Sequence, residues 1–386
     1  MGFRRSVAIV HPLMFQLGGG EYMALVTARI LKDRGFDVKM FTLSLPDRER
    51  IKRFTGFSVD DIPMEELEAD LPASVTEVMH GRKSRYFKLL LSLELEDTVA
   101  ELLDSFDVVF DTQGDVLVPS DITYVHYPWL APDGDSVYSK LFRDVVEKRL
   151  SALRRAKILT NSSWTAAYVR KKYNLMPDVV YPPVDVDSVT ECCREVEKEK
   201  FVLTISRFSP EKNLASILEV AKVVRSTRFV IVGNANTEQS KAVLSELAER
   251  IERFELDNVE IRTNVPRSEL LELQCRAYIY LHPMYPEHFG ISIVESMAAG
   301  AIPIVFKDGG AWYDIVSRVS LDLGYSNPME AAAILKKILS DDKLASRLRS
   351  RAMSVASSFG VDAYASRIVP IVDYVGQIKK FEKNIN

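Results

Sequence analysis

The sequence has few of the residues that mark secreted, metal-binding or nucleic-acid-binding proteins. Its 386 residues include only three cysteines, and two of them, Cys192 and Cys193, are adjacent. This spacing fits neither a disulfide framework nor a zinc site, and it favours a reducing compartment. The net charge is only −4. It gives no reason to expect nucleic acid as a partner.

Long hydrophobic runs are also missing. No apolar run reaches the roughly 18 residues of a membrane span, and no signal-peptide pattern opens the sequence. We therefore expect a cytoplasmic location. The segment from Arg82 to Leu91 mixes basic, aromatic and aliphatic residues. It is compatible with a helix on an anionic membrane surface, and the alternative is an ordinary amphipathic helix packed on a sheet.

Short apolar runs alternate with helical patterns in two successive blocks. The length suits two domains of about 150–200 residues. Strands are predicted at Ser6–Val10, Val38–Leu43, Asp107–Phe110, Ile122–His126, Ile158–Thr160 and Val179–Tyr181 in the first block, and at Phe201–Ile205, Phe229–Val232, Val259–Arg262, Ala277–Leu281 and Ile302–Phe306 in the second. Strands separated by helices predict an α/β fold of two doubly wound parallel sheets.

The break between the two blocks is expected near Tyr181-Pro182-Pro183, and the charged stretch from Glu191 to Lys200 is interpreted as the linker. The sequence after Pro328 is helical in pattern to its end. The expected division is an N-terminal domain over residues 1–188, a second domain over 200–362 and a final helix over 363–386. Ligands of such sheets bind at the carboxyl ends of the strands, so a cleft between the two sheets is the expected site.

The most informative segment is YPEHFGISIVESMAAGAIPIV, residues 285–305. It places Glu287 and Glu295 eight residues apart, with the second in a predicted helix. A carboxylate beside the free amides of a helix start suits a ligand with hydroxyl groups at its ends and phosphate between them. The alternative for Glu295 is structural, because Ser292-x-x-Glu295 also matches a capping box.

Two cations follow the first strand of the second block. Arg207 and Lys212 lie in ISRFSPEKN, between a strand and a helix, where phosphate sites form. Two converging cations can offset the charge of a departing diphosphate. The alternative is a solvated loop.

The first block carries a glycine loop and a histidine at strand ends. Gly18-Gly19-Gly20 follows the first strand and lets backbone approach a ligand closely. It is not GxGxxG, so a dinucleotide-binding dehydrogenase is a poor interpretation. His126 ends a predicted strand, where it can hydrogen-bond a sugar or an acceptor, or serve as a satisfied structural histidine.

Two Asp-x-Asp pairs, Asp133/Asp135 and Asp185/Asp187, match the pattern of metal-dependent sugar transferases. One pair lies in a Pro/Gly-rich loop and the other near the predicted linker. Two-residue coincidences are frequent, so we assign no metal site and expect no cofactor.

Taken together, the segments resemble the retaining glycosyltransferases of family 4, and within that family the α-1,2-mannosyltransferases of dolichol-linked oligosaccharide assembly. The matching segments keep the family's order and span nearly the whole sequence. They are GGGE (18–21), VHYP (125–128), NSSWT (161–165), VYPPVD (180–185), SRFSPEKN (206–213), EHFGISIVESMAAG (287–300) and GGAWYDIV (309–316). The sequence departs from the mannosyltransferases at Tyr285-Pro286 and Ala311-Trp312, which leaves the donor sugar open.

The resemblance implies the two-domain GT-B fold, with the C-terminal helix returning to the first domain. It also implies a role for each candidate residue. Glu287 holds donor-sugar hydroxyls, Glu295 binds the ribose, and Arg207 and Lys212 bind the diphosphate. His126 lies at the reaction centre, and the remaining donor contacts come from Gly19, Gly20, Phe289, Gly290, Ile291 and Ser292.

The predicted function is therefore retaining transfer of a sugar, mannose from GDP-mannose first, to a glycan or polyprenyl-linked acceptor, without a divalent metal. The alternatives are a UDP-glucose or UDP-N-acetylglucosamine-dependent transferase and, from another class, a non-catalytic nucleotide-sugar-binding subunit. The expected partners are the nucleotide-sugar donor and the acceptor, with peripheral attachment to a membrane and no nucleic acid.

Overall fold

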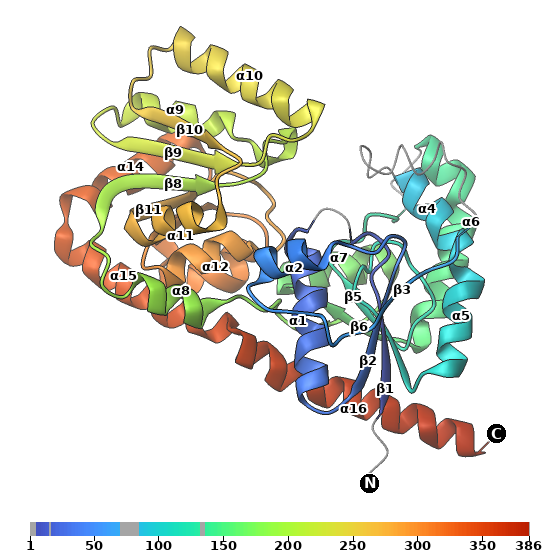
Figure 1. The fold of residues 1–386 in the computed structure, drawn as a ribbon. Helices are drawn as coiled ribbons and strands as arrows, with labels where there is room; N and C mark the ends of the chain where they lie inside the picture. Colours follow the sequence, from blue (N-terminus) through green and yellow to red (C-terminus); the bar gives the residue numbers. More distant parts are fainter. Residues whose placement is uncertain (1–4, 15–16, 70–84, 132–135, 386) are drawn as a thin grey trace. The chain divides into compact units, whose positions relative to one another are not determined.

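The computed structural model describes residues 5–14, 17–69, 85–131 and 136–385 (Figure 1). Its internal contacts divide the chain into two compact units. Unit 1 comprises Met1–Pro183 with Asp362–Asn386, and unit 2 comprises Val184–Val361. Each unit is built on one parallel sheet. The predicted α/β class with two parallel sheets is confirmed.

Unit 1 holds a seven-stranded sheet in the order β3-β2-β1-β4-β5-β6-β7. Its strands are β1 (Ser6–Val10), β2 (Asp37–Thr42), β3 (Met64–Glu66), β4 (Val108–Asp111), β5 (Ile122–Val125), β6 (Lys157–Thr160) and β7 (Asp178–Val179). Its helices are α1 (Gly19–Asp33), α2 (Arg48–Thr55), α4 (Arg85–Glu94), α5 (Glu96–Ser105), α6 (Val137–Ala152), α7 (Ser163–Tyr173) and most of α16 (Val361–Ile385). The sheet is buried on both faces, as apolar runs such as that of β1 require.

Helix α16 packs on unit 1, as predicted for the C-terminal helix, and is the red helix of Figure 1. Arg5 Nη1 donates to the carbonyl of Asp373 at 2.7 Å and also pairs with its carboxylate. Lys379 Nζ lies 2.7 Å from Asp121 Oδ2. These contacts join residues that are more than 250 positions apart.

Unit 2 holds a six-stranded sheet in the order β10-β9-β8-β11-β12-β13. Its strands are β8 (Glu199–Ile205), β9 (Arg228–Gly233), β10 (Val259–Thr263), β11 (Ala277–His282), β12 (Ile302–Phe306) and β13 (Gly324–Tyr325). Its helices are α8 (Val186–Cys193), α9 (Ala215–Val223), α10 (Glu238–Arg253), α11 (Arg267–Arg276), α12 (Ile291–Ala298), α13 (Ser317–Val319), α14 (Pro328–Ser340) and α15 (Asp342–Ala356), with a π-helical segment at Ala311–Val316.

The charged stretch interpreted as a linker is part of unit 2. Residues 191–193 complete α8, and Glu199 and Lys200 begin β8. Strand β8 can begin with two charged residues because its first two positions are exposed. Its burial begins at Phe201. The transition between the units falls at Pro183, in the Tyr-Pro-Pro segment.

Each sheet has one point at which the strand order reverses. In unit 1 it lies between β1 and β4, and in unit 2 between β8 and β11. The carboxyl ends of the strands beside such a reversal are where doubly wound sheets bind ligands. The candidate residues described below lie at or shortly after these ends, in each unit separately. Among the described residues, no helix combines the length and apolarity that crossing a bilayer requires.

Candidate functional site

Glu287 follows the carboxyl end of β11 and meets two partners there. Its Oε2 lies 3.1 Å from Lys212 Nζ and 2.9 Å from His282 Nε2. The side chain of Glu287 is 13% exposed and that of Lys212 16%. Burial by itself raises the pKa of Glu287, but the Lys212 charge and the His282 hydrogen bond outweigh it, and the pKa lies well below its usual value. Glu287 is therefore a carboxylate at neutral pH.

The backbone of Glu287 is fixed by the Gly309-Gly310 turn. Glu287 and Gly309 form a parallel bridge, and the amide of Ala311 donates to the Glu287 carbonyl at 3.3 Å. Gly309 has φ +86°, and a Cβ there would lie 2.2 Å from the Glu287 carbonyl oxygen. Only glycine fits this close approach. The turn thus holds the acidic residue at the strand end.

Lys212 and Arg207 follow β8, the strand next to β11, but they differ in their surroundings. Lys212 ends a short 3-10 turn, Pro210–Lys212, and the next residue, Asn213, donates from Nδ2 to the Pro283 carbonyl at 3.3 Å. That contact ties the two strand-end loops together. The Arg207 side chain is 61% exposed, and its nearest charged partner is Glu211 at 3.7 Å. The structure brings Lys212 to Glu287 and leaves Arg207 largely in solvent.

Glu295 lies on α12 and is held by α11. Its Oε1 is 2.7 Å from Arg267 Nη2, and Gln274 Nε2 approaches Oε2 at 3.4 Å. The capping-box alternative for Glu295 is wrong. Helix α12 begins after Gly290 in a left-handed conformation, without a side-chain cap, so Ser292 is already helical.

The start of α12 supplies the remaining predicted donor contacts. Ser292 Oγ bonds Tyr280 Oη at 2.8 Å, which joins the helix to β11. Phe289 is buried and packs edge-on against Phe359, so its ring serves the core. Gly290 and Ile291 lie at the helix start. The first amides of a helix have no acceptor within it, so this end can hold an anion.

In unit 1, His126 directly follows β5 and is bonded to the residue after β4. Its Nε2 is 3.0 Å from the carbonyl of Thr112. A carbonyl only accepts, so Nε2 carries the proton and Nδ1 is the acceptor of the neutral ring. Burial lowers the pKa of His126, which keeps the ring neutral.

The glycine loop of unit 1 approaches this histidine. A Cβ on Gly20 would lie 3.5 Å from His126 Nε2 and 3.9 Å from His11 Cε1. Gly19 begins α1, whose capping residue is Gly18. The structure therefore groups the predicted Gly19, Gly20 and His126 at the strand ends of unit 1.

Sequence reasoning missed Asp111, a buried carboxyl at the end of β4. Its Oδ1 accepts from the amides of Gln113 and Gly114 at 2.9 and 3.0 Å, whereas Oδ2 has no partner among the described residues. Burial raises the pKa of Asp111 to about 7. The only signal in the sequence is an acidic residue that ends the apolar run VVFD.

Sequence reasoning also gave no role to His282. The residue is buried at the end of β11, and its contact with Glu287 depends on the fold of the four residues between them. A histidine that ends an apolar strand shortly before the acidic motif was the available signal.

The predicted membrane helix is corrected in part. Lys88 of α4 is 3% exposed and pairs with Asp115, so it is not available to lipid headgroups. Phe87 and Leu91 are buried in the core of unit 1. Lys83 and the side chain of Arg85 lie outside the described residues.

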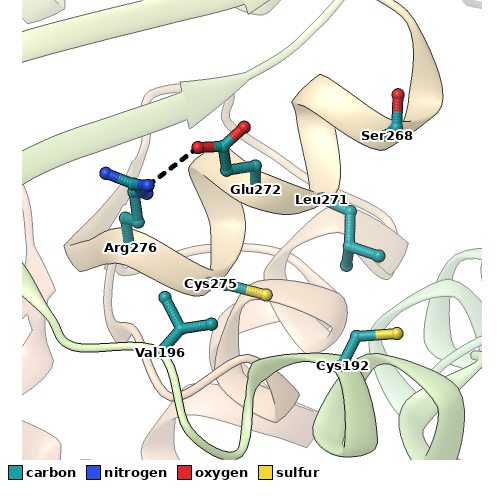
Figure 2. Close-up of a pocket in the computed structure, with 7 residues that line it drawn as sticks. All are labelled: Cys192, Val196, Ser268, Leu271, Glu272, Cys275 and Arg276. Carbon is teal, nitrogen blue, oxygen red and sulfur yellow. Dashed lines mark ion pairs between the residues drawn. The ribbon is translucent and has the colours of Figure 1, made fainter.

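The expectation of no disulfide is wrong. Cys193 of α8 is bonded to Cys275 of α11, because these two helices pack together although the cysteines are 82 residues apart. The cysteine count therefore no longer supports a reducing compartment. Cys275 also lines a pocket of about 260 Å³, together with Cys192, Leu271 and Arg276 (Figure 2). Glu287, His282 and Lys212 are not in its lining, so this pocket is separate from the candidate site.

Neither Asp-x-Asp pair forms a metal centre in the part of the chain that the structure describes. Asp185 and Asp187 lie at the start of α8, and Asp133 and Asp135 fall outside the described residues. No group of three or more acidic, histidine or cysteine side chains with the geometry to hold a metal ion occurs in the described ranges.

Comparison with known proteins gives matches over both units. Residues 17–188 match the model of Glycosyltransferase Family 4, and residues 193–355 match that of Glycosyl transferases group 1. Solved structures match the fold. The sucrose-phosphate synthase of Thermosynechococcus elongatus gives a TM-score of 0.72 at 14% identity, covering 96% of this chain and 99% of that one. Anabaena Alr3699/HepE in complex with UDP and glucose gives 0.68 at 17% identity, covering 96% and 100%.

Several relatives carry the description GDP-Man:Man(3)GlcNAc(2)-PP-Dol alpha-1,2-mannosyltransferase. That of Dictyostelium discoideum is 26% identical over 56% of this chain and 46% of its own length. That of Xenopus laevis is 34% identical over 41% of this chain and 35% of its own length. That of Caenorhabditis elegans is 27% identical over 82% of this chain and 79% of its own length. The match thus spans less than half of the first two relatives. With both units matched by models of one group of enzymes and with the GT-B fold, the chain belongs to the retaining glycosyltransferases of family 4.

Proposed function

We propose that this enzyme transfers mannose from GDP-mannose, with retention of configuration, to a glycan or polyprenyl-linked acceptor. The observation that carries the proposal is the Lys212–Glu287–His282 cluster at the strand-order reversal of unit 2. Oε2 of Glu287 is engaged by both partners, whereas Oε1 makes no hydrogen bond within the described residues. A charged oxygen left available in this way suits a donor-sugar hydroxyl.

Lys212 is the proposed partner of the donor diphosphate, together with Arg207. The diphosphate carries about two negative charges and Glu287 carries one. A bound donor therefore competes with Glu287 for the ammonium group of Lys212. The exposed Arg207 can reach a ligand without first breaking a short ion pair. Both cations stabilise the charge that develops as the diphosphate leaves.

Glu295 is the proposed ribose ligand, and the first amides of α12 are proposed to face the phosphates. The carboxylate is already oriented by Arg267 and Gln274, and charged acceptors bind hydroxyl groups strongly. His126 is assigned to the reaction centre from the family resemblance. Its neutral ring, with Nδ1 as acceptor, can accept a hydrogen bond from a sugar hydroxyl.

The proposed chemistry follows from these roles. The bond between the anomeric carbon and the diphosphate oxygen breaks, and a bond from the acceptor hydroxyl oxygen to the same carbon forms on the same face. The hydroxyl proton passes to the departing phosphate oxygen. No step needs a metal ion, because Lys212 and Arg207 supply the positive charge.

The identity of the donor is suggested by the relatives of this chain and not by the geometry of the site. The relatives named above carry a GDP-mannose description, whereas a UDP-glucose donor is the second candidate, since a structural neighbour was solved with that compound. A non-catalytic binding subunit is the third, and the charged cluster around Glu287 argues against it. Isothermal titration with GDP and UDP, followed by hydrolysis assays with GDP-mannose, UDP-glucose and UDP-N-acetylglucosamine, separates the three. A clear UDP preference would overturn the mannose assignment.

We also propose weak attachment to anionic membranes, which a polyprenyl-linked acceptor requires. Leu90 and Leu93 of α4 remain exposed, and each basic residue near an anionic surface contributes about 1 kcal/mol. The test is co-sedimentation with anionic vesicles at low and high salt, comparing the wild type with a Lys83→Glu/Arg85→Glu variant. Lys88 is left unchanged because it pairs with Asp115. Sedimentation that is absent, or unaffected by the substitutions, contradicts this proposal.

A further inference from the structure

His282 combines deep burial with one engaged and one unengaged ring nitrogen. The residue is 2% exposed. Nε2 lies 2.9 Å from Glu287 Oε2, whereas Nδ1 has no hydrogen-bond partner among the described residues. An ionised carboxylate only accepts, so Nε2 carries a proton. A second proton on Nδ1 would be buried without an acceptor, which is costly. The geometry therefore favours a neutral ring with the proton on Nε2.

The position of this ring is set by the sheet and not by the loop that carries Glu287. His282 is the last residue of β11, and that strand lies between β8 and β12, where His282 pairs in register with Val305. The Tyr325 hydroxyl donates to the His282 carbonyl at 3.0 Å. The Tyr280 ring lies nearly parallel to the imidazole, at 22°. The imidazole is thus anchored in the sheet of unit 2.

Lys212, the other partner of the same carboxylate oxygen, is anchored less firmly. It lies at the end of a three-residue turn on a flexible side chain. If it moves to the diphosphate when a donor binds, Glu287 loses one of its two partners on Oε2. His282 cannot follow a phosphate in this way, because its ring is packed in the sheet and its other nitrogen is buried.

We propose that His282 is a positioning residue for Glu287. It holds Oε2 through the Nε2 proton while Lys212 serves the diphosphate, and so keeps Oε1 aimed at the hydroxyls of the donor sugar. This inference rests on the proposed function, since it assigns Glu287 to the sugar and Lys212 to the diphosphate. It adds a residue to which neither the acidic motif nor the basic loop points.

The test compares His282→Gln with His282→Leu. Glutamine carries an N–H at about the distance of Nε2 from the backbone, whereas leucine fills the space without a donor. We expect His282→Leu to lower kcat by about 10- to 100-fold, the effect of misplacing a substrate-binding group. GDP or UDP affinity should stay within about twofold, because the nucleotide contacts are elsewhere. We expect His282→Gln to recover most of the lost kcat.

Tyr325→Phe is the matched control. It removes a hydrogen bond to the backbone of His282 but leaves the Nε2 contact with Glu287 intact. It should lower the melting temperature without a comparable loss of kcat. For each variant, the loss of kcat is compared with the loss of melting temperature. If this ratio is the same for Tyr325→Phe and His282→Leu, His282 is merely structural and the inference is overturned.

A second readout does not depend on turnover. Nitrogen-15 NMR of the labelled imidazoles at neutral pH should show His282 neutral and protonated on Nε2, with a resonance that shifts in Glu287→Gln. A proton on Nδ1, or a resonance indifferent to Glu287→Gln, overturns the inference even if no tested donor is used. Conversely, the expected signature in a protein that binds neither GDP nor UDP supports the contact and contradicts only the proposed function. Equal loss of kcat in the Gln and Leu variants also contradicts the positioning role.

Discussion

Two buried carboxyl groups at strand ends, one in each unit, have opposite electrostatic surroundings. Asp111 ends β4 of unit 1, with one oxygen on two backbone amides and the other unpartnered, and its pKa is raised to about 7. Glu287 follows β11 of unit 2, beside Lys212 and His282, and its pKa is lowered well below the usual value. Burial acts in the same direction on both. The charged partner decides which of them stays ionised.

The difference in pKa between Glu287 and Asp111 shows which of the two carboxyl groups can act as a permanent charge in a binding site. A carboxylate kept charged inside a site can bind hydroxyl groups and oppose or accept cations. A carboxyl group that titrates near neutrality has no fixed charge to offer a ligand. This comparison supports assigning the donor to the Glu287 site and leaves Asp111 a structural role in its turn. Four predictions test it, in order of decreasing effect.

The largest effect is expected from Glu287. Glu287→Ala should lower transfer by about 1000-fold, or roughly 4 kcal/mol, if the carboxylate binds the sugar where charge develops. GDP affinity should remain largely intact. Glu295→Ala should do the reverse and weaken GDP binding more than the chemical step. Steady-state kinetics and titration calorimetry on both variants check this pair, and the opposite pattern would mean that the two roles are exchanged.

Lys212→Ala is expected to make the two carboxyl groups more alike. The loss of the ammonium should raise the pKa of Glu287, because burial is then opposed by His282 and His288 without the Lys212 charge. Turnover should fall by about 100-fold, close to 3 kcal/mol, through the lost contact to the diphosphate. Carbon-13 NMR of the carboxyl groups and donor kinetics provide the measurements. Arg207→Ala should reduce turnover without moving the Glu287 resonance, since Arg207 pairs with Glu211.

Much of the fold and part of the site could be predicted from the sequence. Strands such as β9 and β12 carry local apolar runs, and Lys212 and Glu287 lie in the loops that follow strands β8 and β11. The remainder depends on contacts distant in sequence. From the sequence, Lys88 looks like a surface cation, because its partner Asp115 lies 27 residues away. The disulfide between Cys193 and Cys275 could not be predicted either, because it depends on the packing of two helices that are distant in sequence.

Asp111→Asn is expected to change the pH dependence of stability. A raised pKa means that the native protein binds more protons than the unfolded chain between about pH 4 and 7, so this group lowers stability as pH rises through that window. Asparagine can keep the contacts of Oδ1 without the charge. The stability of the variant relative to the wild type should therefore rise steadily between pH 4 and pH 8. Urea unfolding at several pH values measures it, and an unchanged profile argues that Asp111 is ionised normally.

The smallest effect is expected at His126, with the opposite sign. Its lowered pKa means that the unfolded chain takes up the proton first, so stability is lost as pH falls below about 6.5. His126→Ala should reduce this loss of stability at acidic pH. It should also reduce transfer by about tenfold while leaving GDP affinity unchanged, because the residue belongs to unit 1. Unfolding curves from pH 5 to 8 and kinetics at saturating donor test both parts, and weaker GDP binding would place His126 among the nucleotide contacts instead.

The most direct test of the account is a calorimetric titration of GDP and UDP into the wild type and the Lys212→Ala variant. The account predicts saturable one-site binding of GDP, tighter than that of UDP, and at least about tenfold weaker in the variant, since a charge-assisted contact to phosphate is lost. Circular dichroism of both proteins should be the same. A wild type that binds neither nucleotide, or a variant that binds GDP as tightly as the wild type, would contradict the claim that the Lys212–Glu287 cluster is the nucleotide-sugar site.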